Sequence, residues 1–455
     1  MKRAAGLLIA AFLIPTAVYA QAIVNDYSKL YEKASPAVVQ VTTDDGSGSG
    51  FLITRFGHIA TNYHVIRNSR YLAVQFPDGR KFKAAVAAVN PQYDMAVLKV
   101  NSEVVQNIEP LAILAEEKES TVKVGIPVVA IGSPLNQKFL MTQGILSKVD
   151  QDTLLGDFLL QAGNSGGPLM NQEGEVIGIN TFGESNIAGA IRVGTLRDFL
   201  SSADLMAESM NTEPPANQLR SLSEVRYPVD VLNHKIESEA LDFEAYKFKA
   251  GDFTVTAITP VLIGKLQVVA EKRRAFNRQE RRGQHISDSS SAEHGIEEPY
   301  YEWHRSTETS LDYAVTFDIR PESGPTKRGM PARMIPSPLR FGKAGRTEME
   351  FKGEFLEFRL YRDGELVEPI MPGRQVIEGS SDQKNSHFVD QAYAGSYVYS
   401  PEEFLTGNEF KVQIIDARNP SQVHKEVVFT ADSKLIRQLR ADFTFVPNVL
   451  ISKAP

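Results

Sequence analysis

Cysteine is absent from this chain of 455 residues. Disulfides, a thiol nucleophile, a cysteine-based zinc site and a lipid anchor on cysteine are therefore excluded. A strong excess of one charge is also missing, since the formal net charge of −7 is modest and argues against a nucleic-acid partner. Long apolar runs are lacking after the first twenty residues, so we expect no stable membrane span. The hydrophobic content of 42% is that of a globular protein, and the length predicts two or three domains.

The N-terminus carries the longest apolar run. A basic start, Lys2-Arg3, precedes Ala4–Val18, and a cleavage-site pattern of small and aliphatic residues ends at Ala20. This order predicts a secretory signal peptide over residues 1–20 and a periplasmic or secreted mature protein. The alternative is an N-terminal membrane anchor, for which the run is short because a bilayer span needs about 20 residues.

A glycine-rich turn, Q-A-G-N-S-G-G-P-L, occupies Gln161–Leu169. Glycine permits positive φ and a close approach of the backbone, so glycines on both sides of Ser165 predict a tight turn with an exposed hydroxyl. This arrangement suits acyl transfer, in which Ser165 attacks a carbonyl and the N–H groups of Gly163 and Ser165 stabilise the resulting oxyanion. The alternative is a glycine-rich hairpin without chemistry.

A serine hydroxyl is a weak nucleophile and needs an adjacent base. His64 follows an apolar strand pattern and is the candidate base; Asp94, at the entry to another apolar strand, is the candidate for orienting its imidazole. An ordinary turn aspartate is the alternative for Asp94. The other histidine of this region, His58, is expected on the surface beside Gly57.

Many short strand patterns, in two runs, predict two packed antiparallel barrels. Predicted strands of the first run are 37–43, 71–76, 81–89 and 95–100; those of the second are 122–124, 128–132, 140–149, 158–161, 175–181 and 187–193. Asp26–Ala34 and Thr195–Leu200 are predicted helices. Asp44–Gly50 lacks the ending of a phosphate-binding loop and is interpreted as a hairpin turn.

The pattern of apolar and polar residues changes after residue 200. Residues 201–226 show little apolar periodicity and are interpreted as a linker, and residues 227–455 as a β-rich, sandwich-like domain. Its predicted strands are 254–258, 311–319, 348–361, 410–415 and 426–430. Residues 279–299 are charged and rich in serine, and we expect a mobile loop there.

Six short motifs together resemble those of trypsin-like serine proteases, and more specifically of the bacterial HtrA/Deg family. They are G-S-G-F-L-I (Gly48–Ile53), T-N-Y-H-V-I (Thr61–Ile66), Y-D-M-A-V-L-K-V (Tyr93–Val100), V-V-A-I-G-S-P (Val128–Pro134), Q-G-I-L-S (Gln143–Ser147) and G-N-S-G-G-P-L (Gly163–Leu169). The resemblance implies that residues 21–200 are mainly β and form a chymotrypsin/trypsin-like double β-barrel, with six strands in each barrel and a catalytic triad in the cleft between them. It also implies endopeptidase activity without a cofactor.

By position, His64 matches the family's base, Asp94 its acid and Ser165 its nucleophile, while Gly163 and Ser165 match the oxyanion donors. Two departures stand out. Residues 156–162 read G-D-F-L-L-Q-A where the family usually carries a T-D-A-A-I-N type of run, and no PDZ pattern follows the linker. Trimerisation and chaperone behaviour are therefore not carried over.

Apolar residues around the turn suggest the specificity. The predicted substrate-binding residues are Leu159, Leu160, Thr181, Phe182, Ala188 and Ala190. They favour small or aliphatic residues at P1, the substrate position before the cut. The alternative is that Leu159 and Leu160 are ordinary core residues.

The sequence thus predicts an exported serine endopeptidase that acts on proteins or peptides through an acyl-enzyme, without cofactor or metal. One alternative is a catalytically silent protease fold that serves as a scaffold, with the function in the C-terminal half. Another is an esterase-like hydrolase, although the G-x-S-x-G context of α/β-hydrolases is absent. We expect the C-terminal half to bind a substrate or partner, or to limit access to the cleft.

Overall fold

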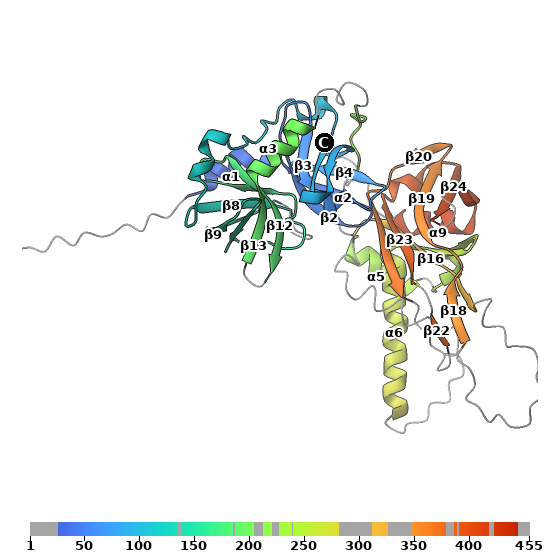
Figure 1. The fold of residues 1–455 in the computed structure, drawn as a ribbon. Helices are drawn as coiled ribbons and strands as arrows, with labels where there is room; N and C mark the ends of the chain where they lie inside the picture. The colour runs from blue at the N-terminus through green and yellow to red at the C-terminus, as the bar shows by residue number, and fades with distance from the viewer. Residues whose placement is uncertain are drawn as a thin grey trace, which may run out of the picture.

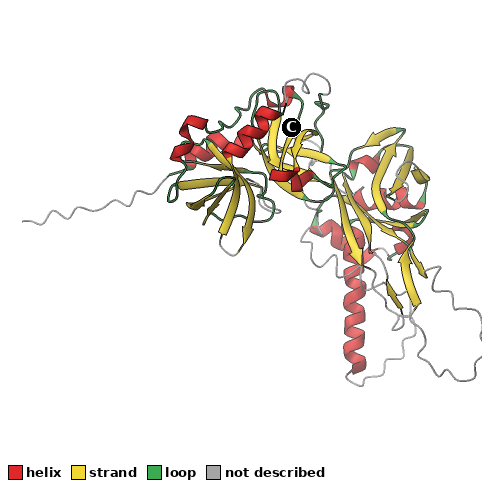
Figure 2. Cartoon of the chain, viewed as in Figure 1, coloured by secondary structure: helices red, strands yellow, loops and turns green. Residues whose placement is uncertain are grey.

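The computed structural model describes residues 26–133, 139–184, 187–203, 213–220, 227–238, 240–281, 312–325, 347–378, 386–388, 391–417 and 423–444. β-Strands dominate both halves of this part of the chain (Figure 2). The predicted signal peptide lies outside the described residues. No helix among them combines the length and the apolar character needed to cross a bilayer.

The first barrel is a sheet of seven strands within the described residues. In pairing order they are β5 (Lys81–Lys83), β4 (Leu72–Gln75), β1 (Val38–Thr43), β2 (Ser47–Leu52), β3 (His58–Asn62), β7 (Met95–Lys99) and β6 (Ala85–Asn90). The family resemblance implied six. The extra strand arises because Ala84, whose N–H donates to Leu72 O at 3.0 Å, divides one run into β5 and β6. Since these two edge strands are consecutive in sequence, the chain itself joins the edges of the sheet.

The second barrel is closed. In pairing order its strands are β10 (Thr153–Gly156), β13 (Ile187–Arg192), β12 (Val176–Glu184), β11 (Pro168–Met170), β8 (Pro127–Gly132) and β9 (Leu140–Val149). The prediction of a double β-barrel is confirmed. The predicted strands at 122–124 and 158–161 are wrong; the second segment follows β9 through contacts such as Thr142 Oγ1 to Leu159 O, at 2.9 Å, instead of a regular ladder.

Short helices flank the barrels. They are α1 (Ser28–Ala34), α2 (Tyr63–Ile66) and α3 (Val193–Ser202), with 3₁₀ turns η1 (Ser35–Ala37), η2 (Pro91–Tyr93), η3 (Ser102–Val105) and η4 (Glu116–Thr121). Helices were predicted at the places of α1 and α3, and α3 extends into the predicted linker. A further part of that linker, 213–220, lies on the first barrel, where Leu219 N donates to Lys81 O at 2.7 Å.

The C-terminal half contains a five-stranded and a four-stranded sheet within the described residues. In pairing order the first is β14 (Lys247–Ala250), β15 (Phe253–Ile258), β16 (Val315–Pro321), β23 (Gln391–Tyr399) and β21 (Met371–Glu378), and the second is β20 (Glu365–Val367), β19 (Phe355–Arg362), β24 (Glu409–Asp416) and β25 (Val423–Thr430). A small sheet of β17 (Ser323–Pro325), β18 (Thr347–Phe351) and β22 (Ser386–Phe388) adjoins them. The predicted strand 348–361 is therefore two strands.

Aromatic side chains from both larger sheets share one core. The rings of Phe317 on β16 and Phe358 on β19 stack with centroids 5.3 Å apart, and Phe355 meets Tyr397 edge-on at 5.9 Å. Burial of such large rings between two sheets is what a sandwich requires. The β-rich character predicted for this half is confirmed.

Helices in this half were not predicted from the sequence. They are α5 (Val229–Ser238), α6 (Pro260–Arg281), α8 (Glu402–Leu405) and α9 (Lys434–Phe443), with the 3₁₀ turn η5 (Phe243–Tyr246). α6 extends away from the sheets in Figure 1. Its last turn includes residues 279–281, where we had expected the start of a mobile loop; residues 282–299 lie outside the described part of the chain.

Candidate active site

Two hydrogen bonds join His64 to Asp94, and two more hold Asp94 to the residues just before His64. The carboxylate of Asp94 accepts from His64 Nδ1 at 2.6 Å and from His64 N at 2.8 Å. Its main-chain oxygen accepts from Asn62 Nδ2 at 3.0 Å and from Tyr63 N at 3.1 Å. Because a carboxylate oxygen accepts at Nδ1, that nitrogen carries the proton and Nε2 is the basic one.

Local backbone geometry explains how Asp94 reaches the histidine. Asp94 ends η2 in the left-handed conformation, with φ at 53°. Aspartate tolerates this conformation better than most residues, and outliers of this kind cluster at functional sites. The turn directs the side chain back toward α2, the single helical turn that carries His64.

Ser165 lies in the turn that leads into β11. Gly163 and Gly166 adopt φ values of 101° and 90°, which residues with a Cβ rarely adopt. The turn also lies against β2, since a Cβ on Gly166 would come within 2.1 Å of Ser49 O. Ser49 holds it by donating from N to Ser165 O at 2.8 Å and from Oγ to Gly163 O at 2.6 Å.

The N–H groups of Gly163 and Ser165 donate to no group of the described residues. Their neighbours do not share this property, because Asn164 N donates to Gln161 O and Gly166 N to Asn180 O. Two unused donors on either side of Asn164, beside a serine hydroxyl, are able to bind an anionic oxygen.

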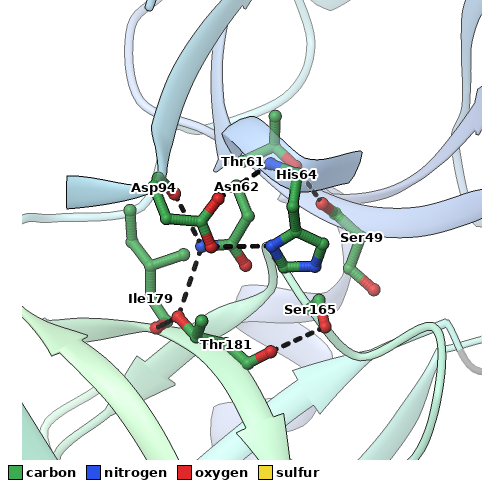
Figure 3. Close-up of polar contacts among 8 residues, drawn as sticks. All are labelled: Ser49, Thr61, Asn62, His64, Asp94, Ser165, Ile179 and Thr181. Carbon is green, nitrogen blue, oxygen red and sulfur yellow. Dashed lines mark hydrogen bonds and ion pairs between the residues drawn. The ribbon is translucent and has the colours of Figure 1, made fainter. Parts of the chain in front are cut away.

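Figure 3 shows the His64 ring between Asp94 and Ser165. The hydroxyl of Ser165 donates to Thr181 O at 2.9 Å, and no hydrogen bond joins it to His64 among the described residues. The Ser165 hydroxyl would have to leave Thr181 O before it could donate to Nε2. Catalytic hydrogen bonds often form only when substrate binds.

Three supporting residues were not predicted from the sequence. Thr61 Oγ1 donates to Ser49 O at 2.7 Å, and Asn62 Nδ2 donates to Thr181 Oγ1 at 3.2 Å. Asn62 thereby links the two barrels beside the candidate triad. The signal was the run G-S-G-S-G. The hairpin turn predicted over Asp44–Gly50 is shorter than expected: residues 44–46 connect the antiparallel strands β1 and β2, and residues 47–50 belong to β2. Glycine is needed there because a Cβ on Gly48 would come within 3.0 Å of Ser165 O.

The predicted substrate-binding residues occupy different environments. Leu159 is 55% exposed, Leu160 packs against the core of the second barrel, and Thr181 contacts Ser165. Ala188 and Ala190 are buried in that core. The side chain of Phe182 lies outside what the structure describes. The assignment of these six residues to substrate binding stays a prediction.

His58 is buried, so the expectation of a surface position was wrong. Its strand, β3, lies between β2 and β7 inside the sheet, and its Nδ1 lies 2.8 Å from Thr54 Oγ1. His58 is therefore part of the core of the first barrel. Within the described ranges, no group of three or more His, Asp or Glu side chains is placed to hold a metal ion.

Residues 48–179 match the model of the trypsin-like peptidase domain. This part of the chain is therefore similar to trypsin-like peptidase domains. The match includes the positions of His64, Asp94 and Ser165, and it spans most of both barrels.

Curated relatives of the peptidase domain are named serine proteases. The chain is 35% identical over 200 residues to serine protease HTRA2, mitochondrial, of Bos taurus, covering 39% of this chain and 43% of the relative. It is 33% identical over 213 residues to serine protease HTRA1 of Xenopus laevis, covering 42% and 44%. The chain thus spans less than half the length of these relatives.

Among solved structures, the chain is similar to the serine endoprotease from Yersinia pestis. The two are 32% identical in sequence, with a TM-score of 0.37, over 39% of this chain and 66% of that one.

Proposed function

We propose that the protein is a serine endopeptidase that uses His64, Asp94 and Ser165 as its triad. The observation that carries the proposal is the Nδ1 bond of 2.6 Å between His64 and Asp94, across from a serine in a turn with two unused N–H donors. The peptidase-domain match and the names of the relatives support the same reaction class.

In the proposed reaction, Ser165 turns from Thr181 O, gives its proton to His64 Nε2 and attacks the substrate carbonyl. The carbonyl oxygen becomes negative and accepts from the N–H groups of Gly163 and Ser165. Asp94 stabilises the imidazolium. His64 then protonates the leaving amine, and a water attacks the acyl-enzyme with His64 again as the base.

We also propose small or aliphatic P1 residues as the preferred substrates. The support is that apolar Leu159 and Leu160 directly precede the nucleophile turn, while Thr181 contacts Ser165. An acid that would bind Lys or Arg is missing at 159 and 160. Cleavage of a mixed peptide library, with cut sites read by mass spectrometry, tests this preference; cuts mainly after Lys or Arg would contradict it.

The proposed domain boundaries are 1–20 for a signal peptide, 21–200 for the peptidase domain, 201–226 for a linker and 227–455 for the C-terminal domain. Separate hydrophobic cores in the two halves support the division. Export to the periplasm or the outside of the cell follows from the proposed signal peptide. A mature N-terminus at Gln21 in secreted or periplasmic protein would support it, whereas an intact Met1 would contradict it.

A silent protease fold remains the second candidate function. The observation that favours it is the bond from Ser165 Oγ to Thr181 O, which leaves the hydroxyl unpaired with His64. A fluorophosphonate probe separates the two candidates, because it labels only a serine that its base activates. Labelling of the native chain but not of Ser165→Ala or His64→Ala supports the endopeptidase; equal absence of labelling in all three supports the scaffold.

A further inference from the structure

The C-terminal sheet contacts the first barrel close to His64. The segment from 67 to 71 leads out of α2, and its exposed residues are Arg67, Asn68 and Arg70. α2 is one turn long with no side-chain cap at its start. A single turn is not stable by itself, so its order depends on the contacts at both of its ends. Asp94 accepts from Tyr63 N and His64 N at the start, and the segment that follows fixes the end.

Arg374, on edge strand β21 of the C-terminal half, forms hydrogen bonds with the segment 67–71 and with Asp44, which also binds that segment. Its guanidinium donates from Nη2 to Asn68 O at 2.7 Å, four residues after His64. Its main-chain N donates to Asp44 O at 2.5 Å. The carboxylate of Asp44 in turn accepts from Arg70 N at 2.7 Å and from Tyr71 N at 3.1 Å.

The Arg374 side chain is fixed in this position. Its guanidinium carbon lies 4.7 Å from the centroid of the Tyr393 ring on neighbouring strand β23. Stacking on an aromatic face limits the freedom of the guanidinium, so less entropy is lost when it bonds to Asn68 O. Asp44 is itself 2% exposed. The bonds from Arg374 N, Arg70 N and Tyr71 N to Asp44 thus form a small, partly buried network that joins the two halves of the chain.

Other contacts between the halves lie further from α2. Lys81 Nζ donates to Ile370 O at 2.6 Å, and Lys83 forms an ion pair with Glu368. These contacts join the β5 strand to the segment before β21 and do not reach residues 67–70. They hold the C-terminal half against the barrel, whereas Arg374 bonds to the loop of His64 itself.

We propose that Arg374 is a positioning residue for His64: by holding Asn68 and Asp44, it keeps α2 in the place where His64 meets both Asp94 and Ser165. The C-terminal half then supports the triad instead of closing the cleft. The inference rests on the proposed endopeptidase function. Because misplacement of a catalytic group by a fraction of an ångström lowers the rate, the effect falls on turnover and not on substrate affinity.

The test compares Arg374→Gln with Lys83→Met in the full chain, using a short peptide substrate. Both substitutions remove one positive charge from the same interface, but only the first breaks the bond to Asn68. Active sites are counted with a fluorophosphonate, so that unfolded protein does not count. For Arg374→Gln we expect kcat per active site to fall about tenfold with KM within about twofold, and for Lys83→Met both to stay within about twofold.

Arg374→Lys keeps one donor and one charge without the planar fork, so it is expected to recover part of the lost kcat. Equal losses of kcat in Arg374→Gln and Lys83→Met would overturn the proposal, because Arg374 would then only help to hold the two halves together. A change in KM alone, or a rise in kcat, would overturn it as well.

A readout that needs no activity separates this proposal from the proposed function. The Nδ1 proton of His64, bonded to Asp94, is observed as a low-field NMR signal. Weakening of this signal in Arg374→Gln, but not in Lys83→Met, supports the positioning role even if no chain cleaves peptides. An unchanged signal in both variants overturns the positioning role of Arg374. The proposed endopeptidase function is tested separately, because it stands if the wild type cleaves peptides.

Discussion

Asp94 in the peptidase domain and Asp442 in the C-terminal half are both carboxylates with hydrogen bonds on each oxygen. Asp94 bonds to the ring and main chain of His64, and the two side chains are 30% and 36% exposed. Asp442 accepts from Tyr246 OH at 3.0 Å and from Gln438 Nε2 at 2.9 Å and is 1% exposed. The His64–Asp94 pair leaves the Nε2 nitrogen of a partly exposed ring for a further partner, whereas the Asp442 carboxylate is buried among its own donors. The comparison shows that exposure and spare hydrogen-bonding capacity, more than the carboxylate itself, mark a site for chemistry.

The energetic setting of the two carboxylates also differs. Burial raises the pKa of the Asp442 carboxyl above its usual value, and the hydrogen bonds from Thr259, Gln438 and Tyr246 only partly oppose this. A carboxyl whose pKa is raised by burial is a candidate for a catalytic role when it lines a cleft. Asp442 instead joins α9 to η5 and to the start of α6, so its role is structural.

The largest expected effect comes from replacing Asp94. Asp94→Asn keeps the shape of the side chain but presents an amide to His64, so the imidazole adopts the wrong tautomer. We expect kcat to fall about 10⁴-fold, with little change in the free energy of unfolding because the pair is partly exposed. Peptide hydrolysis and urea unfolding, measured on the same samples, check this. If Asp94→Asn lowered the free energy of unfolding but kept the wild-type kcat, Asp94 would be a structural carboxylate like Asp442.

Replacing Asp442 is expected to do the opposite. Asp442→Ala leaves Tyr246, Thr259 and Gln438 without their buried partner, which should lower the free energy of unfolding by about 3 kcal/mol. The kcat of the folded fraction should change little. Denaturant unfolding checks the first expectation and active-site titration the second. Unfolding at the wild-type denaturant concentration would contradict the structural role.

The smallest effect is a pH dependence. Because the folded-state pKa of Asp442 lies above the unfolded value, the folded state binds more protons between the two values, and this carboxyl destabilises the protein as pH rises through that window. Asp442→Asn stays neutral and lacks this effect. The melting temperature of Asp442→Asn relative to wild type should therefore rise as pH increases from about 4 toward neutrality.

Other titrating groups cancel in this difference between two chains, because they are the same in both. A difference in melting temperature that stays flat with pH, or that falls as pH rises, would show that Asp442 is not a buried group with a raised pKa.

The candidate triad was predictable because its signals are local. Each residue lies in a short motif, and the glycines at 163 and 166 indicate the positive φ values that the turn requires. Ser49 was missed because its role depends on a partner 114 residues away in the sequence. No periodicity within β2 reveals such a contact.

In the C-terminal half, some strands could not be predicted from local sequence patterns. Alternating patterns predicted β15, β24 and β25, but β21 was missed because it contains Pro372 and Gly373, which count against a strand. The structure places β21 at a sheet edge, where proline is tolerated. In β23, Gly395 weakened the pattern; a Cβ there would come within 2.4 Å of the Phe355 ring. Gly395 is therefore required by the packing of β23 against Phe355 in the other sheet, and such a long-range contact cannot be predicted from the sequence of β23 alone.

The most direct test of the central claim is proteolysis of unfolded casein by the mature chain from Gln21 onward, beside Ser165→Ala. Loss of a triad nucleophile typically lowers kcat by about 10⁴- to 10⁶-fold. We expect cleavage by the native chain and none by the variant. Equal cleavage by both, or none by either under conditions in which the native chain is folded, would contradict the assignment of Ser165 as the nucleophile.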